Sequence, residues 1–168
     1  MNHVHELMAE VATKYALSDE LSIWFDGSVE PTNPGGTGTC GWVIRNGHGD
    51  TLCAESCSLG SGPAMTNNVA EWTALGKALR WLLDNSFKGC TLRIFGDSKL
   101  VIEQLNGTWR CNMPHLQKLK ARCHEIISEL RPAGWTATWI PREQNSEADA
   151  LSQRAYEDST GKKYPARR

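Results

Sequence analysis

Two aspartates follow apolar runs that are typical of buried strands. IWFDGS brings in Asp26 and RIFGDS brings in Asp97, each directly before or after a small residue. Either one alone fits a turn, but the ends of central strands are where ligand sites lie in open α/β sheets. On neighbouring strands the two carboxylates would lie roughly 5 Å apart, the strand spacing. Like charges at that distance raise a pKa unless a cation neutralises them, and oxygen ligands suit Mg²⁺.

Two more acidic residues are candidates for the same site. Glu71 lies in TNNVAEWTAL (66–75), where Asn68 is expected to cap a helix and Glu71 to bond back as a capping box. A carboxylate also suits a first helical turn because the helix dipole is positive there. Asp149 in NSEADALS is either a ligand or an ordinary early-helix acid, and Glu147 beside it is interpreted as the latter. Whether Glu71 only caps its helix or also binds a metal ion therefore depends on where the other carboxylates lie.

The apolar patterning predicts the elements that must position these residues. Alternating or apolar runs predict strands over 21–28, 39–46, 51–59, 91–98 and 135–140. Helical spacing predicts helices over 69–83, 99–105, 114–130 and 146–157. Residues 3–17 have helical composition. This order predicts an α/β protein, with a mixed sheet flanked by helices.

Length and composition indicate a single domain of ordinary size. The 168 residues are 40% hydrophobic and carry a net charge of -1, so binding to nucleic acid would need a local basic patch. We expect an extension over 1–18, the domain over 19–158 and a mobile basic tail over 159–168. No apolar run reaches the length of a membrane span, and the N-terminus does not resemble a signal peptide. The six cysteines lack a CxxC pair, which favours reduced thiols in a cytoplasmic protein and leaves a weak zinc alternative with His48, Cys53 and Cys57.

Several motifs in register resemble those of type 1 ribonucleases H. FDGS is followed by NPGG, TNNVAEWTAL, GDSKLVIEQLNG and WIPREQNSEADALS, and the resemblance covers about residues 20–157. It implies the ribonuclease H-like fold, with a mixed five-stranded sheet. It also implies a quartet of catalytic, metal-binding carboxylates: Asp26, Glu71, Asp97 and Asp149.

The resemblance further implies the reaction and its partners. The expected activity is endonucleolytic cleavage of the RNA strand of an RNA–DNA hybrid by a monomer, leaving a 5′-phosphate and a 3′-hydroxyl. Two Mg²⁺ ions, with Mn²⁺ as an alternative, would supply an activated water and neutralise phosphate charge. Glu71 would then both cap its helix and bind metal. Contact with the 2′-hydroxyls of the RNA is expected from polar residues around the site, namely Asn33, Thr66, Asn67, Asn68 and Ser98.

The sequence departs from parts of the family pattern. Some members carry a histidine in the loop before the last helix, whereas this loop reads PREQNSE and offers Arg142, as in the branch whose loop reads PRE-N. Arginine stays protonated, so Arg142 would stabilise charge rather than act as a base, unless it is only a solvated loop residue. The lysine-rich protrusion of some members is also missing. Trp109, beside Arg110, would grip the DNA strand or else be buried, and the other tryptophans are expected in the core.

Two alternatives to a hybrid-specific enzyme remain open. A non-catalytic nucleic-acid-binding domain of the same fold would be marked by a lost carboxylate, and all four are present. A related nuclease that acts on double-stranded RNA or on DNA is not separated by sequence.

Overall fold

The elements follow the predicted order along the chain. The computed structural model describes residues 20–166, so the expected extension over 1–18 lies outside the described part. The strands are β1 (Glu20–Glu30), β2 (Gly35–Asn46), β3 (Thr51–Gly62), β4 (Thr91–Gly96) and β5 (Gly134–Trp139). The helices are α2 (Asn67–Asp84), α3 (Lys99–Leu105), α4 (Pro114–Leu130) and α5 (Ser146–Thr160), and a 3₁₀ turn, η1 (Arg142–Gln144), precedes α5.

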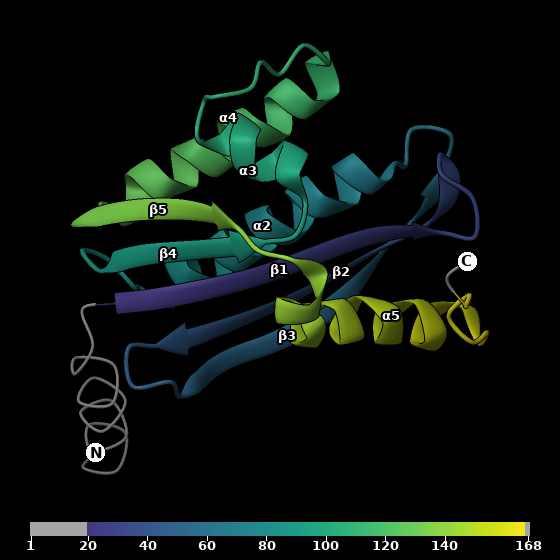
Figure 1. Cartoon of the computed structure of the whole chain (residues 1–168), viewed down its shortest axis with the longest axis horizontal. Helices are drawn as coiled ribbons and strands as arrows, with labels where there is room; N and C mark the ends of the chain where they lie inside the picture. The colour runs from purple at the N-terminus through teal and green to yellow at the C-terminus, as the bar shows by residue number, and fades with distance from the viewer. Residues whose placement is uncertain (1–19, 167–168) are drawn as a thin grey trace, which may run out of the picture.

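The five strands form one mixed sheet in the order β3-β2-β1-β4-β5 (Figure 1). β1 pairs antiparallel with β2, and β2 with β3, as expected for a meander. β1 and β4 are parallel, as are β4 and β5. The carboxyl ends of these three parallel strands therefore meet at one edge of the sheet, which is where Asp26 and Asp97 were expected.

Helices cover both faces of the sheet. α2 packs against β1 and β2, and α4 packs against α2. α5 packs against β1, β2 and β3 on the opposite side (Figure 1). Two glycines permit these close approaches. A Cβ at Gly27 would lie 2.2 Å from the carbonyl carbon of Ala70 in α2, and one at Gly41 would lie 2.3 Å from the carbonyl oxygen of Ala148 in α5.

The core lies between the sheet and α2. The helical spacing noted in the sequence holds, since Trp72, Leu75, Leu79 and Leu82 are fully buried. The tryptophan prediction was too broad: Trp42 and Trp72 are buried, whereas Trp139 is 45% exposed. No disulfide joins the six cysteines, all of which lie in the described residues. Across residues 20–166, every helix is too short or too polar to cross a membrane.

The start of α2 differs from the prediction. Thr66 is the N-cap, and its hydroxyl accepts a hydrogen bond from the Val69 backbone N–H at 3.2 Å. Asn68 is the second residue of the helix, so its expected capping role was wrong. Glu71 lies beyond the first turn, whose free N–H groups it therefore does not cap. Capping therefore does not account for the burial of the Glu71 side chain.

Candidate active site

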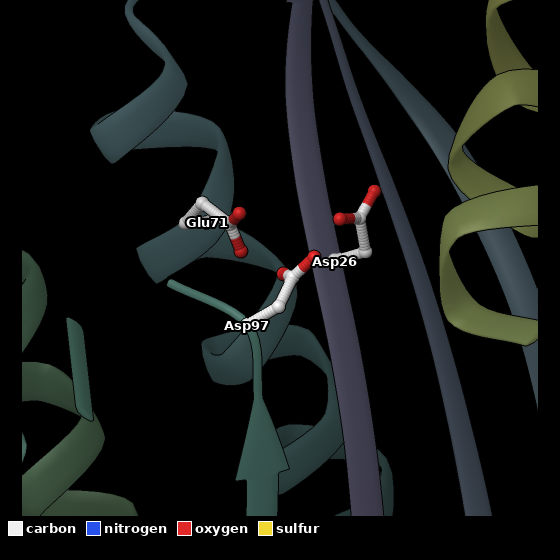
Figure 2. A group of neighbouring side chains, drawn as sticks. All are labelled: Asp26, Glu71 and Asp97. Atoms are coloured by element: carbon white, nitrogen blue, oxygen red, sulfur yellow. The ribbon is translucent and has the colours of Figure 1, made fainter. Parts of the chain in front are cut away.

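Three of the four expected carboxylates meet at the carboxyl edge of the parallel strands. Asp26 lies in β1, Asp97 directly follows β4, and Glu71 reaches them from α2. Carboxylate oxygens of the three residues lie within 4.8 Å of one another. Figure 2 shows Glu71 on α2, Asp26 on β1 and Asp97 just after the end of β4. Among the acidic, histidine and cysteine side chains of residues 20–166, these three form the group whose ligand atoms lie close enough together to share a metal ion.

Strand register and a buried amide hold the two aspartates. Phe25 pairs with Gly96 in the parallel ladder, so Asp26, which lies inside β1, and Asp97, which directly follows β4, are at the same level of the sheet. The Asn145 side-chain amide donates to the Phe25 carbonyl at 2.9 Å and to Asp97 Oδ1 at 3.4 Å. The Trp139 indole N–H donates to the backbone carbonyl of Asp97 at 3.1 Å. Asn145 and Trp139 therefore position the site, although only their context in the loop motif marked them in the sequence.

Glu71 reaches the site because Gly27 has no side chain. The absent Cβ lets the α2 backbone lie against β1, and the Gly27 backbone N–H donates a hydrogen bond to the Glu71 carboxylate. Glu71 is 8% exposed and Asp26 is 3% exposed. Two acidic side chains are thus buried beside each other, which is costly without a compensating charge.

The electrostatics of the cluster favour a cation. Burial, together with the charges of Asp97 and Asp149, raises the pKa of Asp26 to about 7. Burial and the charges of Asp26 and Asp97 raise the pKa of Glu71 well above its usual range. One oxygen of each of these two carboxylates is buried and accepts no hydrogen bond, namely Asp26 Oδ2 and Glu71 Oε2. Oxygen donors left without a partner in this way fit a divalent cation such as Mg²⁺.

Asp149 lies beside the cluster rather than within it. Its Oδ1 pairs with Arg142 Nη2 at 2.5 Å, and its Oδ2 accepts a bond from Gln153 Nε2 at 2.8 Å. Burial raises the pKa of Asp149, and the guanidinium of Arg142 opposes that rise. The charge of Asp149 contributes to the raised pKa of Asp26, and the charge of Asp97 contributes to the raised pKa of Asp149. Arg142 is therefore held by an ion pair at the edge of the site.

Of the polar residues expected around the site, Asn67 lines the cavity beside the cluster and Ser98 follows Asp97, and several of them bind the protein itself. The Asn67 backbone N–H donates to Asn33 Oδ1 at 3.1 Å, and Asn67 Oδ1 accepts from the Val29 N–H at 2.8 Å. Ser98 caps α3 by accepting from the Val101 N–H at 3.4 Å, as Thr66 caps α2. Asn68 is half-buried in the first turn of α2. These contacts fix the strand and helix ends that frame the cluster.

A cavity of about 280 Å³ adjoins the cluster. It is lined by residues of β1, α2, η1 and the C-terminal segment: Asp26, Gly27, Ser28, Glu30, Asn67, Glu71, Asp97, Arg142 and Tyr164. Tyr164 was not identified from the sequence, because it follows the last helix in a segment that was expected to be mobile. α5 also continues to Thr160, beyond the predicted end at 157.

Trp109 lies away from this cavity, in the loop between α3 and α4. It is 45% exposed, so the alternative of core burial was wrong. Only residues 106–113 connect the two helices, and no protrusion is present there. Arg122 on α4, the helix that follows this loop, pairs with Glu125 at 3.0 Å, so its positive charge is partly neutralised. Trp109 is available to stack, and its role remains a prediction.

Residues 25–155 match the family model described as reverse transcriptase-like. Ribonuclease HI of Halobacterium salinarum is 37% identical over 136 residues, which cover 81% of this chain and 64% of that protein. A bifunctional protein of Mycobacterium tuberculosis is 34% identical over 125 residues, which cover 73% of this chain and 32% of that protein. This chain thus matches less than two thirds of the length of either relative.

Solved structures agree with the sequence matches. The ribonuclease H1 structure from Halobacterium salinarum has a TM-score of 0.73 and 34% identity, covering 83% of this chain and 98% of that one. The LC11 ribonuclease H1 in complex with an RNA/DNA hybrid has a TM-score of 0.75 and 31% identity, with the same coverage. The fold and the carboxylate cluster define a ribonuclease H-like protein. The chain belongs to the reverse transcriptase-like family, among the type 1 ribonucleases H.

Proposed function

We propose that this protein is an endoribonuclease that hydrolyses the RNA strand of RNA–DNA hybrids, leaving 5′-phosphate and 3′-hydroxyl ends. The observation that carries the proposal is the cluster of Asp26, Glu71 and Asp97, with its buried oxygens that lack partners. The names of the relatives support it, since they include a ribonuclease HI and a ribonuclease H1 bound to a hybrid.

Asp26, Glu71 and Asp97 would hold the metal ions, and Asp149 would complete the quartet from α5. Two Mg²⁺ ions, or Mn²⁺ in their place, supply when bound an activated water, neutralised phosphate charge and a stabilised leaving oxygen. The protein provides a partly buried site in which these charges are poorly screened. Asp149 also has a second role, because its ion pair with Arg142 orients the guanidinium toward the cavity.

Arg142 is the proposed stabiliser of the negative charge that develops outside the carboxylate cluster. It lines the cavity and carries a positive charge there. We propose that its guanidinium stabilises the leaving oxygen and the released 5′-phosphate. It cannot act as a general base, so proton removal falls to the waters at the site.

Recognition of RNA is proposed for the polar frame and for Trp109. The first turn of α2 presents Asn67 and Asn68, and Asn33, Thr66 and Ser98 fix the neighbouring backbone. RNA differs from DNA by its 2′-hydroxyls, which face a wide minor groove and suit such polar groups. Trp109 would stack on the DNA strand from the α3–α4 loop. We further propose a cytoplasmic monomer whose ribonuclease H domain spans residues 19–158.

A panel of three labelled duplexes tests the proposal. The full-length protein with Mg²⁺ should cleave the RNA of a hybrid and leave duplex DNA of the same sequence intact. Cleavage of duplex RNA at a comparable rate would make it a nuclease of broader specificity. Absence of cleavage of every duplex, with binding of the hybrid, would favour the non-catalytic alternative.

A further inference from the structure

The C-terminal segment contributes a wall to the cavity beside the carboxylates. Tyr164 lines this cavity together with Ser28 and Glu30 of β1. The family match ends at residue 155, so Tyr164 belongs to a part of the chain that the family model does not cover. The position of Tyr164 at the cavity therefore depends on contacts within this chain.

Several contacts hold Tyr164 in this position. α5 ends at Gly161, whose φ of 68° allows the chain to turn back, and the Gly161 N–H donates to the Glu157 carbonyl at 2.9 Å. The Tyr164 backbone N–H donates to Glu157 Oε1 at 3.0 Å. The Tyr164 ring meets the ring of Tyr156 edge to face, with centroids 5.5 Å apart, and Tyr156 is buried. The segment is thus anchored to the last turns of α5.

The Tyr164 hydroxyl faces a carboxylate at the cavity wall. It lies 3.3 Å from Glu30 Oε1, to which it donates a hydrogen bond, and near the Ser28 side chain. Burial raises the pKa of Tyr164 to about 12, so the phenol keeps its proton and remains a donor. A donor and an acceptor therefore lie next to each other, on the same strand as the metal-binding Asp26.

We propose that Tyr164 and Glu30 together bind one 2′-hydroxyl of the RNA strand, on the nucleotide next to the cleaved phosphate. This inference rests on the proposed function. A 2′-hydroxyl is both donor and acceptor, so it can donate to Glu30 and accept from Tyr164. A deoxynucleotide at that position fills neither role. The 2′-hydroxyl would replace the hydrogen bond between Tyr164 and Glu30 with two bonds, whereas a deoxynucleotide leaves these two side chains bonded to each other and gains neither bond.

The proposal is tested with hybrids whose RNA strand carries one deoxynucleotide at a time around a single cleavage site. Wild-type protein and Tyr164→Phe are compared at each position, with kcat and KM measured separately. Tyr164→Phe should lower kcat/KM by about three- to tenfold, mainly through KM, since one hydrogen bond is lost. One deoxy position should reduce cleavage by wild type and reduce cleavage by Tyr164→Phe much less, which shows that the two groups interact.

Two further variants complete the test. Lys163→Ala changes an exposed neighbour that does not line the cavity, and it should behave as wild type. A chain that ends at Gly161 should lose at least as much as Tyr164→Phe, while its melting temperature shows that the fold persists. The proposal is overturned if Tyr164→Phe matches wild type at every position, or if truncation speeds cleavage, which would mean that the segment obstructs the cleft. If wild type cleaves no hybrid, the proposed function itself fails.

Discussion

The side-chain amide of Asn145 donates a hydrogen bond of 2.9 Å to the backbone carbonyl of Phe25, the residue directly before Asp26. Asn145 is 1% exposed and lies where η1 gives way to α5. The same amide reaches Asp97 Oδ1 at 3.4 Å. One residue before α5 therefore links the backbone of β1 next to Asp26 with the side chain of Asp97 after β4.

Asn145→Ala should lower both stability and activity. The variant removes a buried donor, and the loss of such a bond costs about 1–3 kcal/mol. Asp97 also loses a partner that orients its carboxylate. Chemical denaturation and hybrid cleavage measure the two effects, and Gln144→Ala, at an exposed neighbour, provides the matched control. An Asn145→Ala protein as active and as stable as that control would show that the link is dispensable.

Gly27→Ala should disturb the site through the backbone. The new Cβ would lie 2.2 Å from the Ala70 carbonyl carbon, so α2 must move away from β1 and carry Glu71 with it. Overpacking of this kind costs about 1–3 kcal/mol or more. Gly134→Ala is the control, since a Cβ at Gly134 meets no atom within 4 Å. Thermal unfolding compares the two, and equal melting temperatures would contradict the proposed close approach.

The stability of the metal-free protein should fall as pH rises from about 4 to about 7. Burial and the neighbouring carboxylates raise the Asp26 pKa from 3.8 to about 7, so in this range the folded state binds a proton that the unfolded chain releases. At 1.36 kcal/mol per pKa unit, the loss is on the order of 4 kcal/mol. Asp26→Asn should remove the part of this dependence that comes from Asp26, leave the part that comes from Glu71, and be more stable than wild type at pH 8 without metal.

Urea denaturation at pH 5 and pH 8 in the presence of a chelator measures this effect. Added Mg²⁺ should restore the stability of wild type at pH 8, because the cation binds the ionised, folded site, and should do less for Asp26→Asn. Wild-type stability that is flat or rises between pH 5 and pH 8 would mean that the acidic cluster is not strained.

Arg142→Ala should reduce turnover about tenfold, with a smaller change in KM. The guanidinium lines the cavity and is held by Asp149, so its charge is in place when the leaving oxygen becomes negative. Arg142→Lys should recover part of the loss, because it keeps the charge and loses the planar fork. Steady-state kinetics of the two variants decide the matter. Unchanged turnover in Arg142→Ala would mean that Arg142 is only a solvated loop residue with no part in the reaction.

The sequence was sufficient for the order of the elements and for Asp97 at the end of β4, whereas the strand expected to end at Asp26 continues to Glu30. Both correct predictions depend on local patterns, namely apolar periodicity and an acid that follows a strand. The N-cap of α2 was predicted at Asn68 instead of Thr66. Thr66, Asn67 and Asn68 are all residue types that cap helices well, and only the backbone geometry selects Thr66. The contacts of Asn145 and Tyr164 join residues far apart in the chain, 120 and 134 positions in the two bonds described. No local pattern encodes such pairs.

Cleavage of the RNA strand of a labelled hybrid by Asp97→Asn, beside wild type in Mg²⁺, tests the central claim most directly. The amide leaves the shape of the site intact and removes one charge of the cluster that would hold the metal ions. Wild type should cut the RNA strand, and Asp97→Asn should be slower by about 10²-fold or more while it remains folded. A folded Asp97→Asn protein that cleaves at a rate near that of wild type would contradict the assignment of the carboxylate cluster as the catalytic site.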